Sequence, residues 1–217
     1  MNAIQNALFG AISAVVLVPG IAAAMVVLDF EGIGDSNPVG NFYNDYDRPG
    51  TNYGVQFSNA TAIVDSDARG GTGPFANEPS PDTVMVFVDS NHAIVDYAAG
   101  FSTGFSFFYS SSAAATVTVW DGLGGTGTQL GTLNLAPLTF DNCSGDPTGA
   151  FCNWAALGLA FSGTAKSIDF GGAANSTGFD NITFGSITPG IPEPSTYAML
   201  ALGLAGIGFA SRSRKAV

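Results

Sequence analysis

Residues 105–120 read Phe-Ser-Phe-Phe-Tyr-Ser-Ser-Ser-Ala-Ala-Ala-Thr-Val-Thr-Val-Trp and carry the clearest strand pattern in the chain. Phe105, Phe107 and Tyr109 would share one face of a first strand, because successive side chains of a strand point to opposite faces. Two valines alternate with threonines in the same way in a second strand. No sustained helical period accompanies this alternation. The stretch therefore predicts two strands of a sheet with one buried face.

Apolar runs of strand length recur on both sides of this stretch. They span residues 26–30, 54–57, 61–64, 84–88, 129–135, 157–161, 167–170 and 179–184. The chain also holds 29 glycines without a collagen period, and Gly, Asn and Asp separate the runs. About ten short strands with such turns predict an all-β domain, an antiparallel two-sheet sandwich with jelly-roll topology as the first choice.

A glycine-rich segment, Asp121-Gly-Leu-Gly-Gly-Thr-Gly-Thr128, joins two of these runs. Glycines at such density also occur in phosphate-binding loops. Those loops need a following helix, and the nucleoside-triphosphate type needs a lysine, whereas neither follows here. The segment therefore predicts a plain hairpin turn.

Composition and charge exclude some functions. Seventeen acidic against six basic residues give a formal net charge of −11, whereas nucleic-acid binding needs a basic surface. One histidine and three glutamates leave few means of catalysis. We therefore expect a protein that is not an enzyme, with a hydrolase built on paired aspartates as the less favoured alternative.

The N-terminal 24 residues predict a signal peptide. Residues 7–24 are apolar and end on Ala22, Ala23 and Ala24, the small residues that signal peptidase accepts. Cleavage after Ala24 would make Met25 the first mature residue. A buried N-terminal helix is the alternative, and the absence of Lys and Arg from the first residues weakens the orienting charge of an export signal.

The C-terminal 29 residues have three parts: Pro192-Glu193-Pro194, an apolar run from Tyr197 to Ala210, and a basic end with Arg212, Arg214 and Lys215. This layout resembles the PEP-CTERM sorting signal. The resemblance implies a transient inner-membrane anchor, cleavage by an exosortase, and delivery to the cell surface or extracellular matrix of a Gram-negative bacterium. The expected divisions are a β-sandwich at 25–187, a linker at 188–196, a transmembrane helix at 197–211 and a stop-transfer tail at 212–217.

Two cysteines, Cys143 and Cys152, flank a turn-rich loop of eight residues. In an oxidising compartment such a loop can bring the two within bridging distance, so we expect a disulfide. Two free buried thiols are the alternative. A zinc site has too few soft ligands.

The middle of the chain is similar in layout to exported jelly-roll domains that precede PEP-CTERM tails, and these resemble carbohydrate-binding modules. The segments that carry the likeness are 27–32, 53–57, 119–133 and 178–184. The resemblance implies that the first and last strands are neighbours and that their acidic groups hold a structural Ca²⁺. The matching residues are Asp29, Glu31 and Asp180, whose carboxylates would otherwise accept hydrogen bonds in turns.

Aromatic residues in polar stretches are candidates for sugar contact, namely Tyr43, Tyr46 and Trp154, with core packing as the alternative for each. The combined expectation is an exported surface or matrix protein associated with exopolysaccharide or biofilm. A calcium-stabilised, lectin-like carbohydrate-binding module is the alternative. Ice binding would need a regular threonine array, which the chain lacks.

Overall fold

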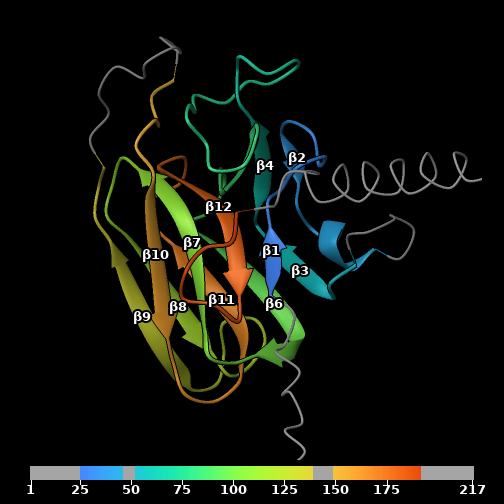
Figure 1. Cartoon of the computed structure of the whole chain (residues 1–217), viewed down its shortest axis with the longest axis vertical. Helices are drawn as coiled ribbons and strands as arrows, with labels where there is room; N and C mark the ends of the chain where they lie inside the picture. The colour runs from blue at the N-terminus through green and yellow to red at the C-terminus, as the bar shows by residue number, and fades with distance from the viewer. Residues whose placement is uncertain (1–24, 46–51, 139–148, 192–217) are drawn as a thin grey trace, which may run out of the picture.

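The computed structural model describes residues 25–45, 52–138 and 149–191, which form twelve strands and one short 3-10 helix, η1 (Phe42–Asn44) (Figure 1). The first sheet has the order β10-β7-β12-β5-β4-β2, and β1 pairs with β12. Its strands are β1 (Val26–Leu28), β2 (Asn37–Pro38), β4 (Thr61–Val64), β5 (Thr83–Val86), β7 (Gly104–Ser111), β10 (Ala155–Ala160) and β12 (Thr177–Phe184). The second sheet has the order β3-β6-β11-β8-β9. Its strands are β3 (Val55–Ser58), β6 (His92–Phe101), β8 (Ala115–Trp120), β9 (Gln129–Leu135) and β11 (Ala165–Gly171).

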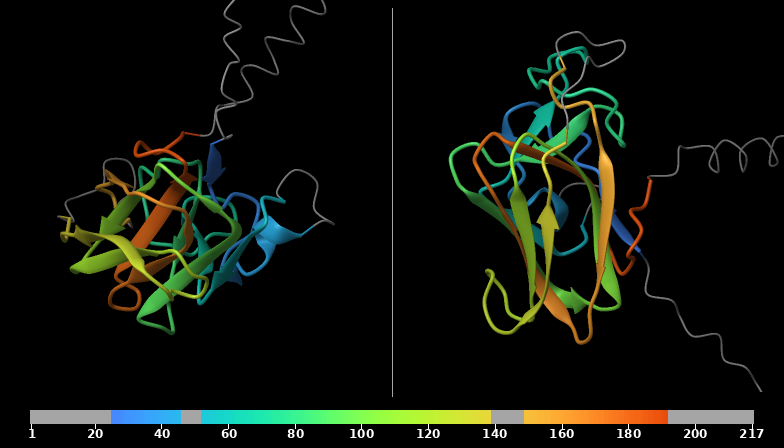
Figure 2. Two further views of the ribbon diagram at one scale, coloured as in Figure 1. Left: turned by 90° about the horizontal axis from the view of Figure 1, so that it is seen from below. Right: turned by 90° about the vertical axis from the view of Figure 1, so that its left-hand side faces the viewer.

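The two sheets pack face to face, and the chain crosses between them repeatedly (Figure 2). After β6 it passes to β7 in the first sheet, returns for β8 and β9, and then alternates through β10, β11 and β12. All strand pairs within the two sheets are antiparallel. Such crossing is typical of a jelly roll rather than of a meander. The predicted antiparallel sandwich is confirmed.

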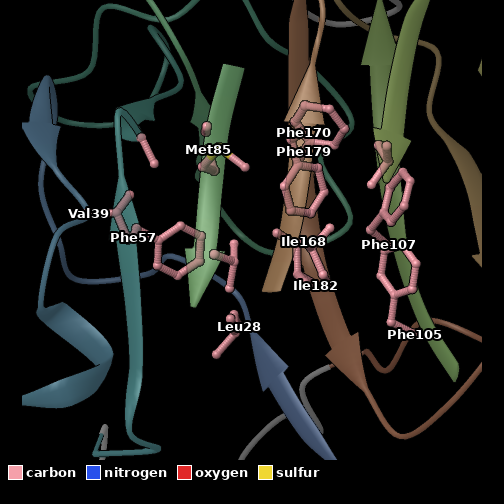
Figure 3. Close-up of a cluster of buried hydrophobic side chains, with 14 of the residues drawn as sticks. Leu28, Val39, Phe57, Met85, Phe105, Phe107, Ile168, Phe170, Phe179 and Ile182 are labelled. Carbon is pink, nitrogen blue, oxygen red and sulfur yellow. The ribbon is translucent and has the colours of Figure 1, made fainter. Parts of the chain in front are cut away.

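Aromatic and branched side chains fill the space between the sheets (Figure 3). Phe105, Phe107 and Tyr109 all point into this core, as their alternation predicts. Phe170 of β11 and Phe179 of β12 meet edge to face across the sandwich, with ring centroids 4.7 Å apart. Such aromatic pairs add to the burial of apolar area, so these two rings join the sheets at their centre.

The longest strand, β6, is absent from the sequence-based expectation. Its second half reads Ala98-Ala99-Gly100, residues that disfavour strands, and this hides the alternation of Ala93 and Val95 before it. Pairing on both sides, with β3 and β11, overrides the weak local preference.

The glycine-rich segment forms the predicted hairpin connection between β8 and β9. The Asp121 N–H donates to the Thr128 carbonyl, and the Asp121 side chain accepts from the Thr128 N–H at 2.6 Å. Gly124, Gly125 and Gly127 adopt positive φ, which the turn requires and which glycine adopts at little cost.

Several predicted features lie outside the described residues: the signal helix at 1–24, the transmembrane helix at 197–211, Tyr46 and Cys143. Over 25–45, 52–138 and 149–191, no helix is long and apolar enough to cross a bilayer. Cys152 is buried beside Ala76. Its pairing with Cys143 stays a prediction, which peptide mapping of the unreduced protein would test.

Candidate functional site

Three predicted metal-site residues come together where β1 meets β12. Strand β1 pairs with β12 through Leu28 and Ile182, so the residues that follow β1 lie beside Asp180. Ser80, in the loop that leads into β5, and Thr83, the first residue of β5, complete the arrangement. We call Asp29, Glu31, Ser80, Thr83 and Asp180 the oxygen cluster.

The Ser80 hydroxyl lies at the centre of the oxygen cluster. Its Oγ is 2.8 Å from Asp180 Oδ1 and 3.3 Å from Glu31 Oε1. Two main-chain carbonyls, of Asp29 and Thr83, are 3.2 and 3.4 Å from the same atom. A hydroxyl has one hydrogen to donate, so it satisfies only one of these four acceptors at a time.

The two carboxylates of the cluster are held by main-chain donors. Asp180 accepts hydrogen bonds from the N–H groups of Ser80 at 2.7 Å and Asn181 at 2.6 Å. Glu31 accepts from the N–H groups of Asp82 at 3.0 Å and Thr83 at 2.8 Å, and from the Thr83 hydroxyl at 3.1 Å. All of these donors are neutral, so they stabilise the carboxylates without cancelling their negative charge.

Burial raises the pKa of Asp180 to about 7, although hydrogen bonds from Ser80 and Asn181 act in the opposite direction. The nearby charge of Glu31 raises the pKa of Asp180 further. A fully buried carboxylate must become protonated or gain a cation if it is not to cost free energy. The oxygen cluster therefore favours either a proton on Asp180 or a bound cation.

The chemistry of the oxygen cluster fits Ca²⁺, which takes hard oxygen ligands from carboxylates, carbonyls and hydroxyls. The candidate ligands are the carboxylates of Glu31 and Asp180, the carbonyls of Asp29 and Thr83, and the Ser80 hydroxyl. The Asp29 carboxylate itself accepts from the Glu31 N–H at 3.3 Å, so this residue would contribute its carbonyl instead of the expected side chain.

In the described ranges, no three His, Cys, Asp or Glu side chains form a group that would hold a metal ion. A cation in the oxygen cluster would therefore depend on main-chain and hydroxyl oxygens as much as on carboxylates. Sequence patterns do not mark such atoms, which is why Ser80 and Thr83 are absent from the sequence-based prediction.

The raised pKa of Asp180 makes the stability of the domain depend on pH. Because the folded-state pKa of about 7 exceeds the ordinary 3.8, the folded form binds the proton more tightly than the unfolded form does. The contribution of Asp180 is present at low pH and is lost as the pH rises from about 4 to about 7. Thermal unfolding of the calcium-free domain across this range should show a smaller loss of stability in Asp180→Asn than in the wild type. Equal losses would contradict the assignment.

Two of the three aromatic residues predicted to contact sugar lie in the described ranges, and Tyr46 lies outside them. Tyr43 is only 2% exposed, and its hydroxyl accepts from the Phe30 N–H at 2.6 Å. Its ring is therefore part of the core and cannot stack on a sugar in this conformation. Trp154 packs against Phe75, and its Nε1–H donates to the Ala76 carbonyl at 3.0 Å.

The outer face of the five-stranded sheet carries polar side chains and one aromatic ring. Register places the following side chains on it: Gln56 and Ser58 of β3, His92, Ile94 and Asp96 of β6, Ser167 and Asp169 of β11, Thr116, Thr118 and Trp120 of β8, and Thr132 and Asn134 of β9. In the sequence, residues of this face alternate with residues that are buried. That alternation could have identified the face, and the buried residues are Ala93, Val95, Val117, Val119, Ile168 and Phe170.

The hairpin at 121–128 covers one end of this outer face. The Gly124 N–H donates to Asp96 Oδ1 at 2.6 Å, and the Gly125 N–H donates to the Ser167 hydroxyl at 3.0 Å. The other end is open and has a shallow hollow, with His92, Thr116 and Asp169 among its lining residues. His92 Nδ1 is 3.6 Å from Asp169 Oδ1, and burial raises the pKa of Asp169 against the opposing effect of His92.

Comparison with protein families identifies a PEP-CTERM protein-sorting motif over residues 190–215. The motif implies export and processing by an exosortase, and it includes Pro192, Glu193 and Pro194. No curated protein matches the chain in sequence.

Structural neighbours of the sandwich include an adhesin domain and carbohydrate-binding modules. The cleaved K2 adhesin domain of Lys-gingipain has a TM-score of 0.45 at 12% identity, over 75% of this chain and 98% of its own. A family 6 carbohydrate-binding module has a TM-score of 0.37 at 16% identity, over 76% of this chain and 94% of its own. The carbohydrate-binding module from Cellvibrio mixtus lichenase 5A has a TM-score of 0.37 at 13% identity, over 60% of this chain and 89% of its own. Sequence identities and TM-scores this low do not identify a ligand. The ligand of this chain is therefore inferred from its own residues.

Proposed function

We propose that the chain is a non-enzymatic protein of the cell surface or extracellular matrix, stabilised by calcium and released from its membrane anchor by an exosortase. The observation that carries the proposal is the oxygen cluster, which joins the start of the domain to its last strand. Its two carboxylates, Glu31 and Asp180, accept hydrogen bonds from the main chain that hold this junction together. The proposal assigns both groups a structural role.

Association with exopolysaccharide belongs to the same proposal, and the outer face of the five-stranded sheet supports it. Sugars are bound by aromatic rings together with hydrogen-bonding side chains of several kinds. Trp120, His92 and Asp169 supply these groups within one face. His92 and Asp169 also line the open hollow at one end of this face, where their side chains are 39% and 30% exposed.

Polysaccharide affinity electrophoresis of the mature domain tests this association. We expect retardation by a neutral matrix polysaccharide, and Asp169→Asn should weaken binding about tenfold because a hydrogen bond to a charged group is lost. Asp67→Asn removes the same charge from an exposed loop residue and serves as the matched control.

The outcome separates the two candidate functions. Retardation that depends on Asp169 would favour the lectin-like module. Retardation that both variants retain equally would contradict the outer face as the binding site, and no retardation by any polysaccharide would leave a structural matrix protein.

A further inference from the structure

Exposed apolar side chains gather where the described chain begins and ends. Of the large hydrophobic residues that are exposed in the described ranges, Met25 (52%), Ile187 (55%) and Ile191 (65%) belong to this group. Both views in Figure 2 place the first strand and the last described residues next to each other on one side of the domain. We call these three residues the terminal apolar edge.

The last described residues pack tightly on the first sheet. The Gly190 N–H donates to Thr183 Oγ1 at 2.8 Å, and Gly190 itself is buried. A Cβ on Gly190 would stand 2.6 Å from Val27 Cγ2 and 3.0 Å from Met25 Cε. Residue 190 thus touches the first residues of the domain, and the folded body extends to the residue before Ile191.

Only a short segment of chain connects the terminal apolar edge to the predicted membrane anchor. Pro192 comes directly after Ile191, and six residues, 191–196, lie between Gly190 and the apolar run that starts at Tyr197. Six residues span at most about 22 Å when fully extended. At the other end, Met25 follows directly on the predicted signal peptide. Both segments with affinity for a bilayer are therefore attached to the terminal apolar edge.

We propose that the terminal apolar edge lies against the lipid surface while the precursor is anchored. The contact depends on the anchor, because residues 25–187 carry sixteen acidic and three basic residues and anionic lipids repel such a body. A tether raises the effective concentration of the edge at the membrane and makes a weak apolar contact effective. Once the chain is cut at the sorting motif, the contact is lost and the domain is free to leave. This inference rests on the sorting motif and is independent of the calcium and polysaccharide proposals.

Tryptophan quenching by lipids tests this proposal. The precursor, residues 25–217, is reconstituted in phosphatidylcholine vesicles that carry a spin label near the headgroup. Trp120→Phe and Trp154→Phe remove the native signal, and Ile187→Trp or Leu123→Trp introduces one probe. Leu123 is an exposed apolar residue (46%) on the hairpin of the other sheet and is the matched control.

We expect at least twofold stronger quenching of the Ile187→Trp probe than of the Leu123→Trp probe, and loss of that quenching in a chain ending at Glu193. Equal quenching of both probes in precursor that floats with the vesicles would overturn the proposal while leaving the anchor in place. Precursor that does not float would overturn both. Hydrogen exchange of the unsubstituted precursor tests the same contact without the risk of a misfolded variant. Amides of residues 25–28 and 185–191 should exchange more slowly on vesicles than in the released domain. An unchanged exchange rate would count against the contact.

Discussion

Asp180→Ala is expected to lower the free energy of unfolding of the mature domain by about 3 kcal/mol or more. The substitution leaves two buried donors without their acceptor, the Ser80 N–H and the Asn181 N–H, and it removes the shortest of the four contacts of the Ser80 hydroxyl. Each unsatisfied buried group costs about 1–3 kcal/mol. Strand β12 lies between β5 and β7, and it also pairs with β1. The lost hydrogen bonds therefore destabilise the centre of the first sheet.

Urea unfolding followed by tryptophan fluorescence measures this effect. Asp169→Ala removes a half-exposed carboxylate from the other sheet and should cost under about 1 kcal/mol. If the two variants were equally stable, the oxygen cluster would not hold the ends of the domain together as described.

Substituting Pro192, Glu193 and Pro194 together with alanine is expected to abolish processing at the C-terminus. The prolines fix φ and keep the residue before each of them out of the helical region, so the motif presents an extended segment to a processing enzyme. In a host with an exosortase, intact-mass measurement of the wild type should show loss of the residues after the motif. The triple variant should keep them through Val217.

Pro189→Ala provides the control, since Pro189 lies just outside the matched motif, which begins at residue 190. It should be processed like the wild type. Processing of the triple variant at the same position would contradict the role of the motif, as would an intact tail on the wild-type protein in that host.

Sequence patterns predict most of the sandwich because burial on one face of a strand imposes strict alternation. The runs at 61–64, 115–120 and 129–135 have the bounds that the structure gives them. Strand β6 is missed because Ala98, Ala99 and Gly100 carry little signal of their own, and only its two neighbouring strands make it a strand.

The candidate site is less visible in the sequence. Resemblance brings Glu31 and Asp180 to attention, but Ser80 and two carbonyls join them through the conformation of a loop, which no pattern encodes. Tyr43 stands among polar residues, Asn41, Asn44 and Asp45, and so has the sequence context of a surface residue. In the structure its ring packs between Phe30 and Phe57 in the core, where the hydroxyl is satisfied by the main chain.

Calcium titration of the mature domain, residues 25–193, tests the central claim most directly. Calorimetry at pH 7.5 should detect one Ca²⁺ per chain, and saturation at one hundred times the dissociation constant should raise the free energy of unfolding by about 2.7 kcal/mol. Asp180→Asn, which keeps the shape of the side chain and removes its charge, should lose both effects. Absence of binding by the wild type, or equal binding by the variant, would contradict a calcium site in the oxygen cluster.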